Sequence, residues 1–209
     1  SPARLQAAYQ TGIFPWSSAG EPLLWWSPDP RCVIEPATFV PSKSLVKTRR
    51  QAGWRFSCNQ AFADVIAACA APRPYADDTW ITAEIQAGYT ALHKLGWAQS
   101  IEVWREDVLV GGLYGVTVGG IFCGESMFSR CRDASKLAFW ALMSLSRAWQ
   151  VELVDCQLEN DHLLSLGATI MSRNDYLALL AQQPETPTLP WSQAHSTLAA
   201  NGFAVAEAL

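Results

Sequence analysis

Residues 100–127 read SIEVWREDVLVGGLYGVTVGGIFCGESM, and this stretch determines the architecture that we expect. Apolar, β-branched and aromatic side chains dominate three runs, which predicts three successive strands. The runs are Ser100–Arg105, Val108–Val118 and Gly120–Met127. The pairs Glu106-Asp107 and Gly119-Gly120 separate them and are typical of hairpin turns. An antiparallel meander is therefore the predicted centre of the fold.

Helical patterns lie on both sides of this meander. Before it, Thr82–Leu95 begins with an N-cap threonine and is followed by Gly96, a usual helix-ending residue. After it, Ala134–Gln150 has the spacing of a long amphipathic helix, and Leu153–Gln157 reads as a buried strand. Shorter predicted elements are a strand at Trp54–Ser57 and helices at Ser42–Arg50, Gln60–Cys69, Asn160–Leu166 and Tyr176–Ala181. This order of elements predicts an α+β domain.

Residues 1–31 differ from the rest of the chain in being rich in aromatic residues and prolines. Pro15, Pro28 and Pro30 restrict their neighbours to extended or turn conformations. We therefore expect a short, irregular segment that cannot form a core alone. The predicted boundaries are 1–31 for a small N-terminal unit and 32–209 for the main domain.

The composition excludes two broad classes of protein. With 209 residues, 50% hydrophobic and 16% charged, the chain is too apolar to be disordered. No uncharged apolar run approaches the roughly 18 residues of a membrane span. The sequence opens without the pattern of a secretion signal, so a soluble cytoplasmic protein is expected.

The 6 cysteines are spaced singly, which favours reduced thiols over a zinc site or a disulfide framework.

Basic residues are concentrated in one short region although the net charge is −4. Lys43, Lys47, Arg49 and Arg50 lie in a region without acidic residues. Two interpretations are open: a solvated helix face, or a surface that contacts phosphates.

The sequence lacks the common catalytic motifs, so the candidate site residues are polar residues that lie at the ends of apolar strands. There is no P-loop, G-x-G-x-x-G, H-E-x-x-H or G-x-S-x-G motif. The polar clusters are Glu125-Ser126, Asp155-Cys156-Gln157 and Asn160-Asp161-His162. A carboxylate at the end of an apolar strand is usually either paired or functional. Cys156 and His162 suggest a thiol hydrolase, but strand alternation turns Cys156 away from Asp155 and Gln157, which argues against a cysteine nucleophile.

Several longer motifs together resemble the bacterial leucyl/phenylalanyl-tRNA–protein transferases. The matching stretches are Tyr9–Trp16, Leu24–Arg31, Thr79–Thr82, Val110–Gly115, Gly124–Ser129, Asp133–Lys136, Asp155–Gln157 and Ser165–Ala168, in the family's order. The resemblance implies transfer of Leu or Phe, and less well Met, from aminoacyl-tRNA to the N-terminal α-amine of proteins starting with Arg or Lys. Such tagging leads to degradation by the N-end rule. No cofactor and no metal are expected, and the protein is expected to be a monomer.

The resemblance also implies a fold. It is a GNAT-like acyltransferase domain, with a mixed, largely antiparallel sheet flanked by helices, preceded by a small N-terminal domain. Family members carry further residues ahead of the start of this sequence, so the small domain is expected to be truncated.

Roles for individual residues follow from the same resemblance. Asp155 would orient Gln157, whose amide would contact the attacking amine or the developing oxyanion, and Glu125 would lie near the donor's α-amine. Trp16 and Trp80 would hold the terminal adenosine. The remaining residues line the substrates: Tyr9, Tyr89 and Asn160 around the reacting groups, and Leu113, Met127, Phe139, Leu142 and Val154 around the donor side chain. Lys43, Lys47, Arg49 and Arg50 would contact phosphates of the acceptor stem.

Two alternatives stay open from the sequence. An acyl-CoA-dependent N-acetyltransferase of related fold would need a Gly-containing phosphate loop before a helix, and Ser129–Asp133 contains no glycine. A noncatalytic module that binds the end of aminoacyl-tRNA would differ from the enzyme only in activity.

Overall fold

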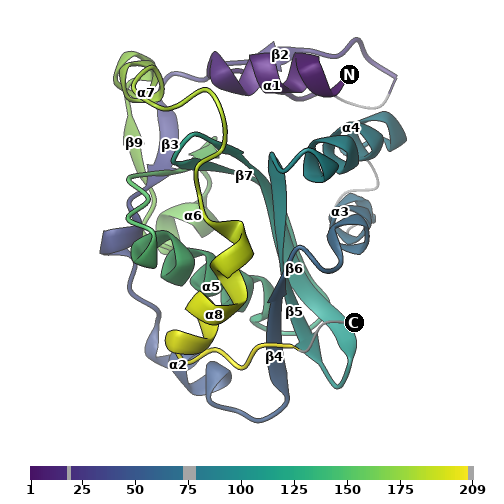
Figure 1. Ribbon diagram of the computed structural model, residues 1–209, viewed down its shortest axis with the longest axis vertical. Coiled ribbons are helices and arrows are strands. Elements are labelled where there is room, and N and C mark those ends of the chain that lie inside the picture. The colour runs from purple at the N-terminus through teal and green to yellow at the C-terminus, as the bar shows by residue number, and fades with distance from the viewer. Residues whose placement is uncertain (18–19, 73–78, 207–209) are drawn as a thin grey trace.

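The computed structural model describes residues 1–17, 20–72 and 79–206, which are built around a seven-stranded sheet (Figure 1). The strand order is β4-β5-β6-β7-β8-β3-β9. The strands are β3 (Arg31–Ile34), β4 (Trp54–Cys58), β5 (Ala98–Arg105), β6 (Val108–Val118), β7 (Ile121–Ser129), β8 (Val154–Gln157) and β9 (Thr169–Met171). Among these seven strands of the described chain, β7 and β8 pair in parallel and the other neighbouring strands pair antiparallel. The predicted α+β class with a mixed, largely antiparallel sheet is therefore confirmed.

The predicted meander forms strands β5, β6 and β7. The turn between β5 and β6 is made by Glu106 and Asp107, with φ of 50° and 63°, and the next turn contains Gly119 with φ of 53°. These left-handed conformations are the ones that tight hairpin turns require. Both turns lie where the sequence predicts them.

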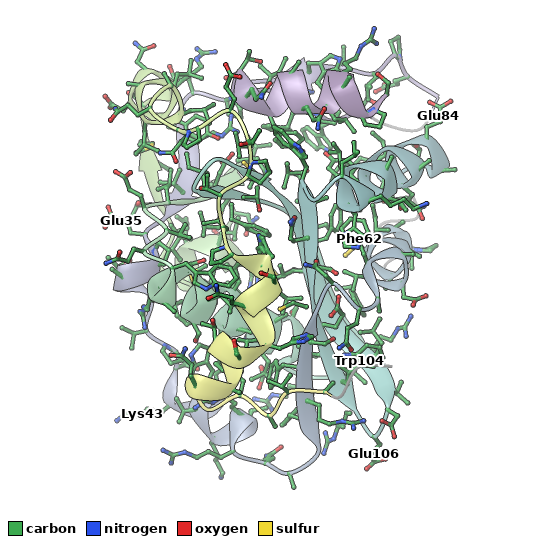
Figure 2. All side chains as sticks on the ribbon, in the orientation of Figure 1. Glu35, Lys43, Phe62, Glu84, Trp104 and Glu106 are labelled. Carbon is green, nitrogen blue, oxygen red and sulfur yellow. The ribbon has the colours of Figure 1, made fainter. Side chains whose placement is uncertain are left out.

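Helices cover both faces of the sheet (Figure 1). On one face α3 (Phe62–Ala70) packs against β5, β6 and β7, and α4 (Ala83–Lys94) packs against β5. On the other face α5 (Ala134–Ala148) packs against β5, β6 and β7. The shorter helices are α2 (Lys43–Arg49), α6 (Asp161–Ser165), α7 (Arg173–Leu180) and α8 (Ala194–Ala200), with 3₁₀ turns at Pro36–Thr38 and Trp191–Gln193. Side chains fill the layers between helices and sheet (Figure 2).

The N-terminal region is more regular than the sequence suggested. The irregular segment expected for residues 1–31 contains helix α1 (Pro2–Gln10) and a two-stranded sheet of β1 (Phe14–Pro15) and β2 (Trp25–Trp26). Proline at the first helical position is compatible with helix formation, and the residues after it are mostly good helix formers. Burial of Leu5 and Tyr9 accompanies packing of α1 against α4.

The C-terminal tail, for which the sequence predicted nothing, also packs onto the domain. Helix α8 contacts α5 and β4, and Leu198 is fully buried. Beyond it, Val205 pairs with Phe56 at the edge of β4. The described part of the chain contains no helix long and apolar enough to cross a membrane.

The parallel strands β7 and β8 create the opening that holds the candidate site. Helix α5 connects them, and they pair only at Phe122 with Val154 and at Cys123 with Asp155. After Cys123 and Asp155 the two strands no longer pair with each other. The next residues of β7, 124–127, are partly exposed. A cavity therefore begins where this pairing ends.

Candidate functional site

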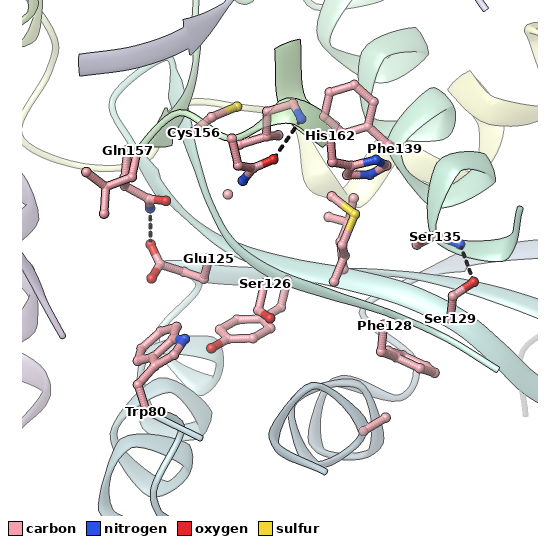
Figure 3. Close-up of a pocket in the computed structure, with 18 of the residues that line it drawn as sticks. Trp80, Glu125, Ser126, Phe128, Ser129, Ser135, Phe139, Cys156, Gln157 and His162 are labelled. Carbon is pink, nitrogen blue, oxygen red and sulfur yellow. Dashed lines mark hydrogen bonds between the residues drawn. The ribbon is translucent and has the colours of Figure 1, made fainter. Parts of the chain in front are cut away.

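A cavity of about 1040 Å³ lies between β7, β8, α5 and the N-terminal strand β1. Figure 3 shows its wall, with Glu125 and Gln157 facing each other and Trp80 beside them. Predicted site residues that line it are Trp16, Trp80, Leu113, Glu125, Met127, Phe139, Leu142, Val154, Gln157 and Asn160. The fold thus brings together residues that are far apart in the sequence.

Asp155 lies behind this wall and has all its hydrogen-bonding capacity in use. Its Oδ1 accepts from Arg31 Nε at 2.8 Å and from the Gln157 backbone N–H at 2.9 Å. Its Oδ2 accepts from Arg31 Nη2 at 2.6 Å and from the Tyr176 hydroxyl at 2.9 Å. Asp155 is fully buried, so it can hold Gln157 in place but has no free oxygen to offer a substrate.

Arg31 was not predicted as a site residue, although it ends a motif that the sequence analysis used. Its guanidinium lies over the rings of Tyr176 and Phe14, 4.2 and 5.2 Å from their centroids, and donates to Gly12 O at 2.9 Å. Burial opposes its charge, but hydrogen bonds to Asp155 and the charge of Asp155 outweigh burial and raise the pKa of Arg31. This ion pair fixes β3 to β8 from inside the core.

Gln157 ends β8 in a left-handed conformation, with φ of 59°. Its Nε2 donates to Glu125 Oε1 at 2.9 Å, across the opening between β8 and β7 (Figure 3). Because Nε2 is turned toward Glu125, the amide oxygen of Gln157 remains as an acceptor. Gln157 therefore presents a fixed carbonyl group at the cavity wall.

Glu125 is joined to two tyrosines from other elements. The Tyr89 hydroxyl of α4 donates to Glu125 Oε2 at 3.2 Å, and the hydroxyls of Tyr89 and Tyr9 are 2.5 Å apart. Burial raises the pKa of Glu125 to about 7, and the charge of Asp155 adds to this, whereas hydrogen bonds from Tyr9 and Tyr89 oppose it. Near neutral pH Glu125 can thus exist in either protonation state. Tyr9 and Tyr89 lie behind the wall and support Glu125.

The predicted apolar residues line one part of the cavity. Leu113, Phe139, Leu142 and Val154 are buried, and Met127 is partly exposed. They come from β6, α5, β8 and β7, so no local sequence pattern could have grouped them. Together they form a slot that would accept an apolar side chain.

The tryptophans differ in exposure. Trp16 is 43% exposed, and its ring packs edge-on against Trp26 with centroids 5.9 Å apart. Trp80 is partly buried, from the segment just before α4. An exposed indole face at the cavity rim is suited to stacking on a base.

Two polar residues near the cavity accept hydrogen bonds from backbone N–H groups of nearby helices. Asn160 caps α6 by accepting from Leu163 N at 2.9 Å, and Ser129 accepts from Ser135 N at 3.2 Å in the turn before α5. Ser126 and His162 also line the cavity. The Cys156 sulfur points away from Glu125 (Figure 3), but Cys156 is partly exposed and lines the cavity as Gln157 does, so strand alternation does not remove it from the site. The described residues contain no cluster of His, Cys, Asp or Glu that could hold a metal.

The basic residues of α2, and Arg50 directly after it, lie outside the cavity wall. Lys43, Lys47 and Arg50 are exposed, and Figure 2 shows Lys43 at the periphery of the molecule. Arg49 is different, because its guanidinium lies over Trp140 and Phe203, 4.2 and 4.6 Å from their centroids. Arg49 therefore has a packing role in addition to its charge.

Helix α2 is also connected to the start of α5. Thr48 Oγ1 donates to Asp133 Oδ2 at 3.1 Å, next to Arg132 and Lys136. Arg132 and Lys136 were not predicted as site residues, although both lie close to Ser129 in the sequence. They extend the basic surface toward the cavity, where Arg130 and Ser135 form part of the wall.

Comparisons with known proteins point to one family. The profile described as "Leucyl/phenylalanyl-tRNA protein transferase" matches residues 33–181, and that of its N-terminal domain matches residues 1–29. A protein of this name from Shewanella frigidimarina is 53% identical over 187 residues, covering 90% of this chain and 80% of its own. One from Pseudomonas fluorescens is 53% identical over 192 residues, covering 91% and 85%.

Solved structures are much more distant. A GCN5-related N-acetyltransferase from Kribbella flavida overlaps 77% of this chain and 57% of its own, at 13% identity and a TM-score of 0.35.

The buried ion pair gives a first prediction. Replacing Arg31 by Met leaves the Asp155 carboxylate buried without a counter-charge, which should lower the free energy of unfolding by about 3–5 kcal/mol in urea titrations. Adding Asp155→Asn should recover part of this loss. The control is Arg173→Met, because Arg173 lies 3.5 Å from Asp29 in an exposed pair that should contribute only about 0–1 kcal/mol. Equal effects of the two Met variants would contradict the central role of Arg31.

The raised pKa of Glu125 gives a second prediction. Between about pH 4.5 and about pH 7, the folded chain holds a proton on Glu125 that the unfolded chain has released, so stability falls as pH rises. Gln does not titrate. Glu125→Gln should therefore gain stability relative to wild type across this window, by up to about 3 kcal/mol, and the difference should stay constant above it. Urea titrations across the window test this, with Glu84→Gln at an exposed site of α4 as control. Parallel pH profiles for wild type and Glu125→Gln would refute it.

Proposed function

Because the chain belongs to the leucyl/phenylalanyl-tRNA–protein transferase family, we propose that it transfers Leu or Phe, and less well Met, from aminoacyl-tRNA to proteins. The acceptor is the N-terminal α-amine of a protein that starts with Arg or Lys, and the product is a substrate for N-end rule degradation. The enzyme acts as a cytoplasmic monomer. The observation that carries the proposal is Gln157 at the edge of an apolar slot, with its backbone N–H held by Asp155 and its side-chain amide held by Glu125.

The reaction needs positioning and removal of one proton. The acceptor nitrogen bonds to the ester carbonyl carbon, the bond from that carbon to the ribose oxygen breaks, and the released hydroxyl takes up a proton. Converting an ester to an amide is favourable without a cofactor. Since an α-amine has a pKa of about 7.7–8.0, a weak base suffices.

Gln157 is assigned to the acceptor amine. Its Nε2 is engaged by Glu125, so its amide oxygen can accept an N–H of the amine and aim the lone pair at the ester carbon. Asp155 is a positioning residue, because both its oxygens are occupied and one of them fixes the Gln157 backbone. Neither residue has to act as a strong base.

Glu125 is assigned to the donor's α-amino group. A carboxyl with a pKa of about 7 can bind an ammonium group as carboxylate and can also take up a proton near neutral pH. Tyr9 and Tyr89 are phenols whose pKa values are raised by burial and by Glu125, so they stay neutral and donate to it. They hold Glu125 in the orientation that faces Gln157.

The rest of the donor has matching surroundings. The slot of Leu113, Met127, Phe139, Leu142 and Val154 would take the Leu or Phe side chain, and Trp16 and Trp80 would stack on the terminal adenosine. Asn160 lines the region of the reacting groups while capping α6.

Acceptor-stem phosphates are assigned to the basic surface of α2, formed by Lys43, Lys47, Arg49 and Arg50. Such contacts carry no sequence information, which suits an enzyme that accepts tRNAs for more than one amino acid. We also propose the domain division at residue 31, which is supported by family matches that end at residue 29 and resume at residue 33.

Labelled Phe-tRNA and a peptide beginning with Arg test the activity. Label should enter the free peptide and not its N-acetylated form, because only the free amine is a nucleophile. Gln157→Ala should lower kcat about 100-fold with donor affinity unchanged, since its amide acts on the reacting atoms. The matched control is Gln182→Ala, at an exposed position after α7. Binding of Phe-tRNA without transfer would instead identify a noncatalytic module, and transfer from acetyl-CoA would identify an N-acetyltransferase.

Charge reversal on α2 tests the tRNA surface. The double variant Lys47→Glu/Arg50→Glu should weaken transfer from full tRNA about tenfold or more, and should reduce its dependence on salt. Transfer from a minimal donor, phenylalanyl-adenosine, should be unchanged. Arg49 is left intact because it packs on Trp140. Lys94→Glu, at an exposed position of α4, is the control. Equal losses with both donors would refute the assignment.

A further inference from the structure

Two cysteines lie side by side directly behind Gln157. Strands β3 and β8 pair with Cys32 opposite Gln157 and Val33 opposite Asp155, with an irregularity between Cys32 and Val33. Cys156 is therefore the extra residue of a bulge on β8, next to Cys32 on the facing strand. Gln157 is the residue directly opposite Cys32, and Cys156 lies one residue along from it. Both cysteines pack in the same apolar cluster, which is the geometric basis for expecting that a disulfide can join them.

The two thiols interact but differ in access. Cys32 is fully buried in an apolar cluster on the α5 side of the sheet, and Cys156 packs against the same cluster while remaining partly exposed at the cavity wall. A hydrogen bond between them lowers the pKa of the Cys32 thiol and raises that of Cys156. Cys156 is thus the member of the pair that keeps its proton, and it is also the accessible one.

We propose that Cys32 and Cys156 form an oxidation site, at which a hydroperoxide links them in a disulfide that stops aminoacyl transfer. The cross-link itself follows from the position of the two thiols. Its effect on activity rests on the function proposed above, in which Gln157 contacts the attacking amine.

The chemistry is balanced with one hydroperoxide. The Cys156 thiol releases its proton and its thiolate attacks one peroxide oxygen, so that the O–O bond breaks and the departing hydroxide takes up a proton and leaves as water. Cys32 then attacks the sulfur of the Cys156 sulfenic acid, the S–S bond forms, and a second water leaves. Two thiols are oxidised and hydrogen peroxide is reduced to two waters.

The expected effect on Gln157 follows from the packing. To reach bonding distance, about 2.05 Å between sulfurs, one residue has to move, and Cys32 is held in the core. Cys156 therefore moves toward β3, and with it Gln157, which is next in the chain. Since Gln157 depends on single hydrogen bonds to Asp155 and Glu125, this shift should draw its amide away from Glu125.

Peroxide treatment of the full chain tests both parts. Peptide mapping without reductant should join the Cys32 and Cys156 peptides, and transfer from Phe-tRNA should fall about 100-fold, as expected for a displaced catalytic group. A thiol reductant should restore both. Cys32→Ala should resist inactivation, whereas Cys131→Ser should remain sensitive, since Cys131 is partly exposed but lies in the turn before α5. Cys156→Ser is tested by peptide mapping and not by its activity, and it should yield no cross-link at Cys32.

The outcomes separate this proposal from the proposed function. Failure of the Cys32–Cys156 cross-link to form, or inactivation of Cys32→Ala to the same extent as wild type, would overturn the oxidation site. A cross-linked chain that still transfers Phe at the original rate would overturn the link to Gln157. A chain that forms the cross-link but never shows transfer would support the thiol pair and contradict the proposed function.

Discussion

The ion pair of Arg31 with Asp155 is the interaction on which the rest of the site depends. It is fully buried and uses both oxygens of the carboxylate, so it satisfies the charges that burial would otherwise make costly. Through Gly12, Phe14 and Tyr176 the same guanidinium also contacts the N-terminal segment and α7. One side chain thereby aligns three parts of the chain around the strand that ends in Gln157.

A second constraint is the limited pairing of β7 with β8. A fully paired sheet would bury Glu125 and Gln157 against backbone, whereas strands that separate beyond Cys123 leave these two side chains facing each other. Their bond spans the opening and is supported from α4 by Tyr89. The site is therefore built on strand and helix residues, which hold geometry better than loops do.

Most of the fold could be predicted from the sequence because the signals were local. Hairpin turns at Glu106-Asp107 and Gly119-Gly120 and the N-cap Thr82 act within a few residues, and the structure contains all of them. Helix α1 was missed because the prolines and aromatics around it masked a short helical run. Helix α8 was missed because its burial depends on α5 and β4, which are distant in the sequence.

In the candidate site too, features with a local sequence signal could be predicted and features that depend on distant contacts could not. Residues in recognisable motifs, such as Glu125 and Gln157, could be selected, but their mutual hydrogen bond could not be predicted, since it depends on how far β7 and β8 separate. Arg31 looked like the end of a turn motif, and its burial against a carboxylate 124 residues later has no local signal. The same holds for Tyr9 and Tyr89, whose contact joins α1 to α4.

The sequence separation between Arg31 and Asp155 also bears on how the chain folds during synthesis. Residues are made from the N-terminus onward, so Arg31 leaves the ribosome long before Asp155 and Tyr176 exist to receive its charge. Until then the aromatic N-terminal segment has no buried anion to dock against, and β3 lacks both of its neighbours in the sheet. The meander of β5, β6 and β7, with its local contacts, can form first. The N-terminal segment, although made earliest, is thus among the last parts to reach its final place.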